Sequence, residues 1–238
     1  MSALVDPGSV VDTTGDPGWV PVRVVARLAE PVINLDGHPA HLDGPAAWAA
    51  FEEYVAVHGH HSLPPMRHDN AVDFMLPMAT WTAPAPEEAH ELTRAANPDL
   101  VWGWACSRAH YTPLGYVTVP MRRKPATGEA ARYAPDKKWH LAAGPLKARD
   151  TPTPAVLTRE ITWWALADPG ELERLLRRVR TLGRHTRHGN GRVLAWEITP
   201  DEEARTRWRD RTWPHPGGLP DTIRAPYHHP TRRMPCRA

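Results

Sequence analysis

The spacing of apolar side chains predicts strands near both ends of the chain. Residues 22–28 are rich in β-branched residues, which is typical of a strand. Residues 160–166 are apolar on both faces and indicate a buried strand, while 192–198 alternate between apolar and polar side chains. Shorter runs at 101–106 and 115–119 predict two more strands in the middle of the chain.

Two helices are predicted next to these strands. Residues 46–57 form a helical pattern that begins after Asp43, a suitable N-cap, and ends before Gly59. In residues 171–181 the apolar side chains recur at i, i+3, i+4 and i+7 from Leu172, which defines one buried helix face. A strand followed by a helix at both ends favours an α+β fold with a ferredoxin-like, RRM-type sheet.

The composition along the chain suggests three parts. Residues 1–20 are rich in Gly, Pro and Asp and are expected to form a flexible arm. Residues 21–200 would form the ferredoxin-like domain, with an insertion around 60–158 whose first part, up to residue 100, is proline-rich and looks irregular. Residues 201–238 are rich in Arg, Trp and Pro and would pack over the sheet or onto a partner.

Composition excludes several classes of protein. With 41% hydrophobic residues the chain can bury a core, and 11 Trp against 2 Phe make Trp its main aromatic residue. No apolar run is long enough to predict a membrane span, and the N-terminus lacks the features of a secretory signal. Cys106 and Cys236 offer neither a disulfide framework nor a Cys-based zinc site, so a cytoplasmic location is expected. The histidines around 58–61 lack further ligands at metal-binding spacing, so no metal or cofactor is predicted.

Charge is unevenly distributed. Residues 1–150 hold 13 Lys and Arg against 17 Asp and Glu, whereas residues 151–238 hold 16 basic residues against 10 acidic ones. All 16 are Arg, whose planar guanidinium binds phosphate oxygens and stacks on bases. This asymmetry favours a polyanionic partner, and the alternative is a solvated surface in a protein from an Arg-rich genome.

The strongest candidate for binding is the glycine-rich loop, residues 183–192, which joins the second helix to the last strand. Gly183 is also a suitable helix C-cap. Three glycines allow positive φ and a close approach to a ligand, and three arginines supply positive charge. The loop follows a helix and lacks a Lys-Ser/Thr ending, so it is neither a P-loop nor a dinucleotide fingerprint. It is either a nucleic-acid-binding loop or a mobile basic hairpin with ordinary turn glycines.

Residues 163–198 resemble the helix, glycine-rich loop and last strand of the RAMP superfamily of CRISPR–Cas effector proteins. Residues 22–51, with Leu-Asp-Gly at 42–44, are similar to the first strand and helix of type IV Cas group-five-like (Csf) subunits. Segments 133–152 and 211–230 also resemble that family, while 60–100 match it poorly. The resemblance implies a RAMP core with a middle insertion and an extended C-terminal tail.

The resemblance also implies a role. Such subunits hold the 5′ handle of the CRISPR RNA, cap the backbone filament and contact the large subunit near the target-adjacent DNA motif. The chain would then be a non-catalytic RNA-binding subunit whose partners are CRISPR RNA, the backbone and large subunits, and target DNA. One alternative is a metal-independent endoribonuclease using His185 or His188, together with Tyr111, Tyr133 or Lys138. The other is an adaptor that binds only protein.

The residues expected to contact RNA lie in the loop and in two other places. They are Gly183, Arg184, His185, Thr186, Arg187, His188, Gly189, Asn190, Gly191 and Arg192, together with Arg27, Lys137, Lys138 and Trp139. DNA or subunit contacts are expected from Arg122, Arg123, Lys124, Arg177 and Arg178. For 122–124 and 137–139 the alternative is an exposed insertion without a ligand.

Overall fold

The computed structural model describes residues 3–35, 40–63, 71–94, 98–123 and 149–237. Within these ranges the chain forms few helices and four antiparallel sheets, which confirms the α+β class. Among the described residues, no helix combines the length and the apolar character needed to cross a membrane.

The central sheet contains β7 (Glu160–Ala167), β1 (Val20–Leu28) and β8 (Val193–Pro200), in the order β7-β1-β8 with both neighbours antiparallel to β1. Residues 105–110 run along the free edge of β7 through isolated bridges from Cys106 and His110. Both sequence-predicted terminal strands and the one preceding α3 are therefore confirmed. This order, with a helix between β7 and β8, is compatible with a ferredoxin-like core.

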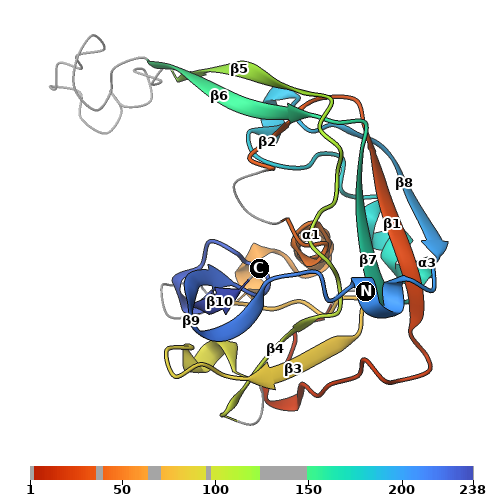
Figure 1. The fold of residues 1–238 in the computed structure, drawn as a ribbon, viewed down its shortest axis with the longest axis vertical. Helices are drawn as coiled ribbons and strands as arrows, with labels where there is room; N and C mark the ends of the chain where they lie inside the picture. The colour runs from red at the N-terminus through yellow and green to blue at the C-terminus, as the bar shows by residue number, and fades with distance from the viewer. Residues whose placement is uncertain (1–2, 36–39, 64–70, 95–97, 124–148, 238) are drawn as a thin grey trace, which may run out of the picture.

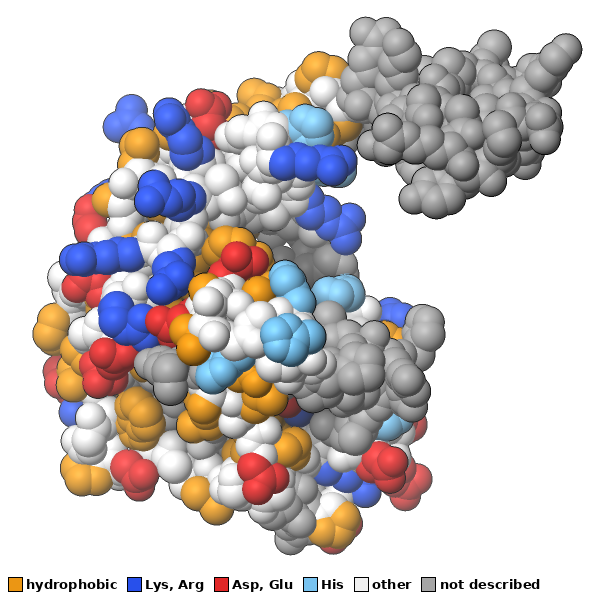
Figure 2. Space-filling model, turned by 180° about the vertical axis from the view of Figure 1, so that it is seen from behind, with side chains coloured by type: hydrophobic (Ala, Val, Ile, Leu, Met, Phe, Trp, Pro, Cys, Tyr) orange, Lys and Arg blue, Asp and Glu red, His pale blue; other side chains and the backbone are white. Residues whose placement is uncertain are grey.

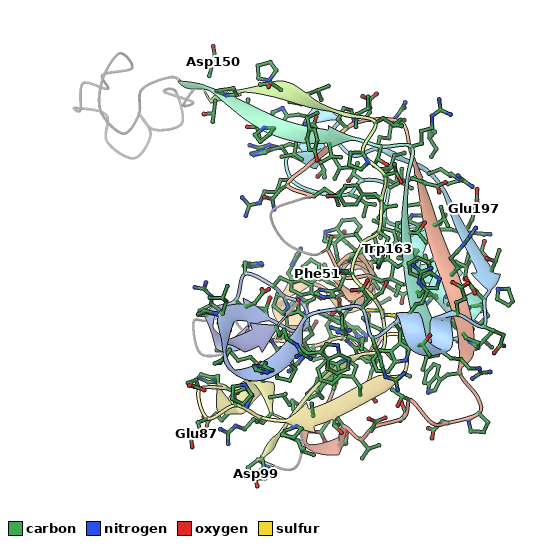
Figure 3. All side chains as sticks on the ribbon, viewed as in Figure 1. Phe51, Glu87, Asp99, Asp150, Trp163 and Glu197 are labelled. Carbon is green, nitrogen blue, oxygen red and sulfur yellow. The ribbon has the colours of Figure 1, made fainter. Side chains whose placement is uncertain are left out.

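Helices α1 (Asp43–His58) and α3 (Pro169–Leu176) pack against each other and against this sheet. Fully buried alanines on α1 and buried leucines on α3 supply the contacts. The buried Trp163 of β7 lies between the sheet and α1 (Figure 3), and its indole N–H donates to the carbonyl of Ala40 at 2.7 Å. Asp168 caps α3 by accepting a 3.0 Å hydrogen bond from the amide of Glu171.

Strands β5 (Gly115–Arg123) and β6 (Arg149–Leu157) form a hairpin that projects from the body of the molecule, as Figure 1 shows. The short strand β2 (Val32–Ile33) pairs with β6 at the base of this hairpin. The hairpin therefore continues the sheet surface next to the start of the glycine-rich loop, which also lies against β2.

A second, smaller core lies at the other end of the molecule. It is bounded by β3 (Thr80–Pro84) paired with β4 (Leu100–Trp104), and by β9 (Trp213–Thr222) paired with β10 (Arg233–Arg237). Helix α4 (Ala204–Arg207) joins this region to the central sheet. The buried apolar residues of this core include Trp81, Val101, Trp208, Ile223 and Met234. Short 3-10 turns complete the fold at Pro7–Ser9, His60–Ser62, Glu91–Thr93, Thr186–His188 and Pro230–Arg232.

Two buried arginines tie the C-terminal segment to the body. Arg224 donates to Asp73 from Nε at 3.2 Å and from Nη2 at 3.3 Å, and Arg232 donates to the same carboxylate at 2.7 Å. Neither arginine side chain is exposed to solvent. Arg224 also lies over the Trp102 ring, 3.9 Å from its centroid. A shared carboxylate thus offsets two desolvated cations.

A second polar cluster holds the same segment to the start of α1. The Tyr227 hydroxyl donates to Asp43, and the amide of Ala225 donates to the same carboxylate at 3.2 Å. The His41 ring stacks on Tyr227 with 5.3 Å between centroids and accepts a 3.0 Å hydrogen bond from the amide of Thr212. Burial raises the pKa of Asp43 above its ordinary value. Asp43 is fully buried and is the first residue of α1. The prediction that it is the N-cap is therefore wrong: Leu42 occupies the N-cap position, and no side chain caps the helix.

Other differences from the sequence predictions have local causes. Helix α3 ends at Leu176 instead of 181, and a turn at 177–178 brings Val179 into the core. Gly183 is therefore not its C-cap. Strands β3, β6, β9 and β10 were not expected, whereas the predicted strands at 101–106 and 115–119 correspond to β4 and β5. The segment 137–141, whose sequence is compatible with a short strand or a hairpin tip, lies outside the described residues.

Candidate nucleic-acid interface

The glycine-rich loop, residues 183–192, is anchored at both ends. Its start lies on β2, where the amide of Arg184 donates to the carbonyl of Ile33 at 3.1 Å. Its end is held by the amide of Gly191, which donates to the carbonyl of Pro31 at 2.9 Å. The amide of Leu182 donates across the base of the loop to Gly191 at 2.8 Å. These bonds fix the position of the loop relative to the hairpin and to β8.

The three glycines serve different purposes. Gly183 and Gly191 have φ of 83° and 66°, and both pack tightly inside the protein. A Cβ on Gly183 would lie 2.5 Å from the carbonyl oxygen of Ile33, and one on Gly191 would lie 1.9 Å from that of Leu182. Gly189 also has a positive φ, 90°, but a Cβ there would meet no atom within 4 Å. Of the three glycines, only Gly189 has open space where a side chain would stand.

The middle of the loop is a single 3-10 turn, Thr186–His188, whose amides are partly used within the protein. The amides of His188 and Gly189 donate to His185 and Thr186 carbonyls at 3.0 and 2.9 Å. Asn190 is buried, and its side-chain amide donates to the carbonyl of His185 at 3.3 Å. Asn190 therefore holds the loop from inside, and side chains must provide most of the contacts with an anion.

Three arginine side chains supply that capacity. Arg184, Arg187 and Arg192 are exposed, and within the described part of the chain none of them forms an ion pair with a carboxylate. Arg187 donates from Nε to the Nε2 atom of His188 at 3.3 Å. Figure 2 shows Lys and Arg side chains spread over the face seen from behind, with His side chains beside them. Exposed, unpaired guanidiniums are suited to phosphate oxygens.

A groove lies between the loop and the projecting hairpin. This hairpin groove has a volume of about 370 Å³. It is lined by Ile33, Asn34, Leu35, Tyr116, Thr153, Pro154, Ala155, Val156, Arg184 and His185. Tyr116 is 65% exposed, so an aromatic ring and a guanidinium border the same hollow. This combination is typical of surfaces that bind single-stranded nucleic acid.

A second groove lies between the loop and α1. This helix groove has a volume of about 280 Å³ and is lined by Pro45, Trp48, Val179, Thr181, Leu182, Gly183 and Thr186. The loop therefore separates two hollows, each with one exposed aromatic side chain. Sequence reasoning missed both Tyr116 and Trp48. The signal for Trp48 is its position outside the i, i+3, i+4 spacing of the buried alanines at 46, 49 and 50.

The remaining predicted cations lie elsewhere. Arg27 donates to Glu160 and, at 2.9 Å, to Glu197, so two carboxylates already balance its charge. The hydrogen bond with Glu197 is the main cause that raises the pKa of Arg27. Glu197 lies at the outer face of β8 (Figure 3), away from α1. Arg27 thus borders a different hollow from Arg184 of the loop.

The predicted DNA or subunit contacts are only partly described. Arg177 pairs with Glu173 at 2.6 Å, and Arg178 lies 3.7 Å from Glu53, which also binds Arg174. Residues 122 and 123 belong to β5, but their side chains lie outside the described part of the structure. Lys124, Lys137, Lys138 and Trp139 also lie outside it.

Another hollow, of about 680 Å³, lies on the outer face of the central sheet and is lined by Arg27, His110, Tyr111, Arg159, Glu160 and Trp164, among others. His110 Nε2 is 2.9 Å from Asp210 Oδ2, and burial, together with the nearby Arg207 and Arg108, lowers the pKa of His110 in spite of this carboxylate. The histidines proposed for cleavage, His185 and His188, are in the loop with ring centroids 6.4 Å apart. The structure does not bring Tyr111 and these histidines to one hollow.

The described residues contain no group of three or more His, Cys, Asp or Glu side chains placed to hold a metal ion. Cys106 and Cys236 are both buried and free, and burial raises the pKa of each thiol to about 12. The buried His41 faces Tyr227 and does not join the exposed histidines at 58–61.

The family model described as CRISPR type IV associated protein Csf3 matches residues 115–236, slightly more than half of the chain. This range includes the hairpin, β7, α3, the glycine-rich loop, β8 and nearly all of the C-terminal segment. No curated protein matches the chain.

Proposed function

The chain belongs to the family of CRISPR type IV associated protein Csf3, and from this membership we propose that it is the subunit that binds the guide RNA of a type IV effector complex. In this proposal it is non-catalytic, holds the 5′ handle of the CRISPR RNA and caps one end of the backbone filament. Residues 21–200 form the RAMP domain of the proposal, with the insertion around 60–158, and residues 201–238 form its extension.

The observation that supports the proposal is that Arg184, Arg187 and Arg192 are exposed on an anchored loop and, among the residues that the structure describes, form no ion pair with a carboxylate. A loop fixed by backbone hydrogen bonds presents its charges at defined positions, which lowers the entropic cost of binding a strand. Each guanidinium can bind a phosphate through two parallel N–H groups. The chain then grips the ribose-phosphate backbone, while base pairing by the guide selects the target.

The contacts with protein and DNA follow from the same placement. The backbone and large subunits are the expected neighbours, and the proposal assigns contact with them to the hairpin β5–β6, which projects from the body of the molecule (Figure 1). Arg122 and Arg123 are the last residues of β5, and the proposal assigns contact with a subunit or with DNA to them and to Lys124. Arg177 and Arg178, on the turn after α3, would make a second contact of this kind.

The test is co-purification with candidate backbone subunits, followed by sequencing of the retained RNA. Binding of the purified chain to repeat-derived RNA is then measured over a range of salt concentrations. Changing Arg184, Arg187 and Arg192 together to Ala should weaken binding and reduce the slope of log K against log salt by about 0.7 for each lost phosphate contact. The matched control changes three exposed arginines of the C-terminal segment, Arg205, Arg233 and Arg237, to Ala, which alters the net charge equally.

Three results would contradict the proposal. Equal RNA binding and salt slope in wild type and the loop variant would show that the loop is not the binding surface. Cleavage of repeat RNA without metal, lost in a variant with His185 and His188 changed to Ala, would identify the chain as an endoribonuclease. Stable assembly with subunits in the absence of any bound RNA would identify it as a protein adaptor.

A further inference from the structure

Trp48 occupies an unusual position on α1. The buried residues of that helix are Asp43, Ala46, Ala49, Ala50 and Glu53, which together form its inward face. Trp48 lies off this face, and 49% of its surface is exposed. An indole is a costly side chain to leave in water, since it carries a large apolar area. Its position therefore calls for a ligand or a partner surface.

The surroundings of Trp48 indicate which kind of ligand. In the helix groove it faces Gly183 and Thr186 of the glycine-rich loop. It also lines an apolar groove of about 370 Å³ together with Phe51, Tyr227 and His228. Trp48 thus stands between the arginine-bearing loop and a hollow bordered by further aromatic rings. Basic side chains beside exposed rings are the usual combination in sites for single-stranded nucleic acid.

The C-terminal segment of the protein does not account for the exposed face of Trp48. The C-terminal segment that packs next to it is already fixed, because Tyr227 donates to Asp43 and Arg224 binds Asp73. The loop that borders the helix groove carries Arg184, Arg187 and Arg192, which are exposed and, among the described residues, form no ion pair with a carboxylate. A polyanion satisfies both features, because its phosphates pair with the arginines and its bases present flat apolar faces.

We infer that Trp48 is a stacking platform for one nucleobase of the RNA strand whose phosphates are held by the glycine-rich loop. This inference rests on the proposed function. It adds a position at which the protein holds a base by its ring face and is tolerant of sequence, since every base has such a face. Purines, with the larger ring, should bind better than pyrimidines at this position.

The experiment crosses a protein change with an RNA change. Full-length wild type, Trp48→Ala and Trp48→Phe are titrated with short single-stranded oligoadenylate and with an abasic ribose-phosphate oligomer of the same length. Because Trp48→Ala lacks the base–aromatic stack, its affinity for oligoadenylate should be about 5-fold to 150-fold lower than that of wild type. The abasic oligomer should bind both proteins equally, and Trp48→Phe should retain most of the affinity. The salt slope should not change, because Trp48 carries no charge.

A matched control is Val57→Ala, which removes an exposed apolar side chain from the same helix, where 56% of Val57 is accessible to solvent. It should bind both oligomers like wild type. Circular dichroism and thermal melting of each variant check that α1 is intact.

The outcomes separate this inference from the proposed function. If the triple arginine variant loses RNA but Trp48→Ala binds oligoadenylate like wild type, the stacking inference is wrong and the RNA-binding function stands. If Trp48→Ala weakens the abasic oligomer equally, or lowers the salt slope, the ring acts through the loop and the inference is also wrong. If Trp48→Ala binds both oligomers like wild type but no longer co-purifies with a backbone subunit, Trp48 contacts protein and the stacking inference is wrong. If neither variant changes RNA binding, the RNA is bound at another surface, and both the assignment of the loop and the stacking inference are wrong.

Discussion

The sharpest stability prediction concerns Asp73, because this one carboxylate serves two buried guanidiniums. Replacing Asp73 with Asn or Ala removes the charge that offsets Arg224 and Arg232, both fully shielded from solvent. Burial lowers the pKa of Arg224 to about 10, so it remains charged at neutral pH in spite of its desolvation. The substitution therefore leaves uncompensated buried charge in the core.

The magnitude follows from the contacts that are lost. Three hydrogen bonds end on the carboxylate, at 3.2, 3.3 and 2.7 Å. In the described part of the chain Arg232 has one other acceptor, the carbonyl of Ala71 at 3.3 Å. Removing one partner of a buried ion pair costs about 3–5 kcal/mol. Asp73→Asn keeps one acceptor oxygen and should lie near the lower limit, while Asp73→Ala should lie near the upper limit.

Urea unfolding followed by circular dichroism measures the lost free energy of unfolding, and thermal melting of the same variants measures the change in Tm. For a chain of this size about 1 kcal/mol shifts Tm by roughly 2–4 °C, so Asp73→Asn should lower Tm by about 6–12 °C. The control is Glu173→Gln, which breaks the exposed pair with Arg177 and should cost at most about 0.5 kcal/mol. If Asp73→Asn and Glu173→Gln destabilise the protein equally, the C-terminal segment is not held by the buried pair and the reasoning is refuted.

Three further predictions test the fold around the site. Burial and nearby arginines lower the pKa of His41 well below its ordinary value, so below about pH 6.5 the unfolded chain binds a proton that the folded chain does not. The free energy of unfolding should therefore fall with decreasing pH by up to about 1.4 kcal/mol per pH unit, and His41→Gln should flatten this dependence in urea titrations; identical profiles would contradict it. Tyr227→Phe, which removes the donor to Asp43, should cost about 1.5–3 kcal/mol in the same assay, and a loss within error of zero would show that the bond is not formed. Gly189→Ala should cost only the strain of positive φ, about 1–2 kcal/mol, whereas Gly191→Ala also clashes with a backbone carbonyl and should cost clearly more; equal thermal shifts would mean that the loop base is not packed as described.

The central strands were predictable because the polarity of their side chains matches the burial of each face of the sheet. β7 is apolar on both faces because α1 covers one side and α4 part of the other, so Trp163 and Trp164 are both buried. β8 alternates because only one of its faces is covered. These patterns arise locally and survive in the sequence. The family resemblance at 163–198 draws on the same strongly patterned region, and the matched family model includes it.

The C-terminal strands could not be predicted in the same way. β9 contains Pro214, Pro216 and Pro220, and proline lacks the N–H that a sheet interior requires. Among the described residues β9 pairs with β10 alone, through an irregular register, so its other edge needs no N–H donors from these prolines. Helix α3 illustrates a different limit. Leu172 and Val179 are seven positions apart, and both are buried whether the helix continues to Val179 or ends at Leu176 and is followed by a turn.

At the candidate site, the sequence revealed the charges of the loop but not its internal contacts. The spacing of arginines and glycines at 183–192 predicted a basic, flexible connection, and the loop arginines are exposed. That Gly183 approaches Ile33 and Gly191 approaches Leu182 depends on how distant segments pack. The predicted role of Asp43 as a helix cap failed for the same reason, because its partner Tyr227 lies 184 positions away.

The attachment of the C-terminal segment bears on how the protein is made. Asp43 and Asp73 are synthesised early, but their partners Tyr227, Arg224 and Arg232 follow 151 or more positions later. Until the C-terminal segment has been synthesised, these carboxylates lack their buried partners and the start of α1 is not covered by that segment. Contacts of such long range form last, after the cost of closing the chain has been met. The side of the molecule that carries Trp48 is therefore completed only after these late residues have been synthesised.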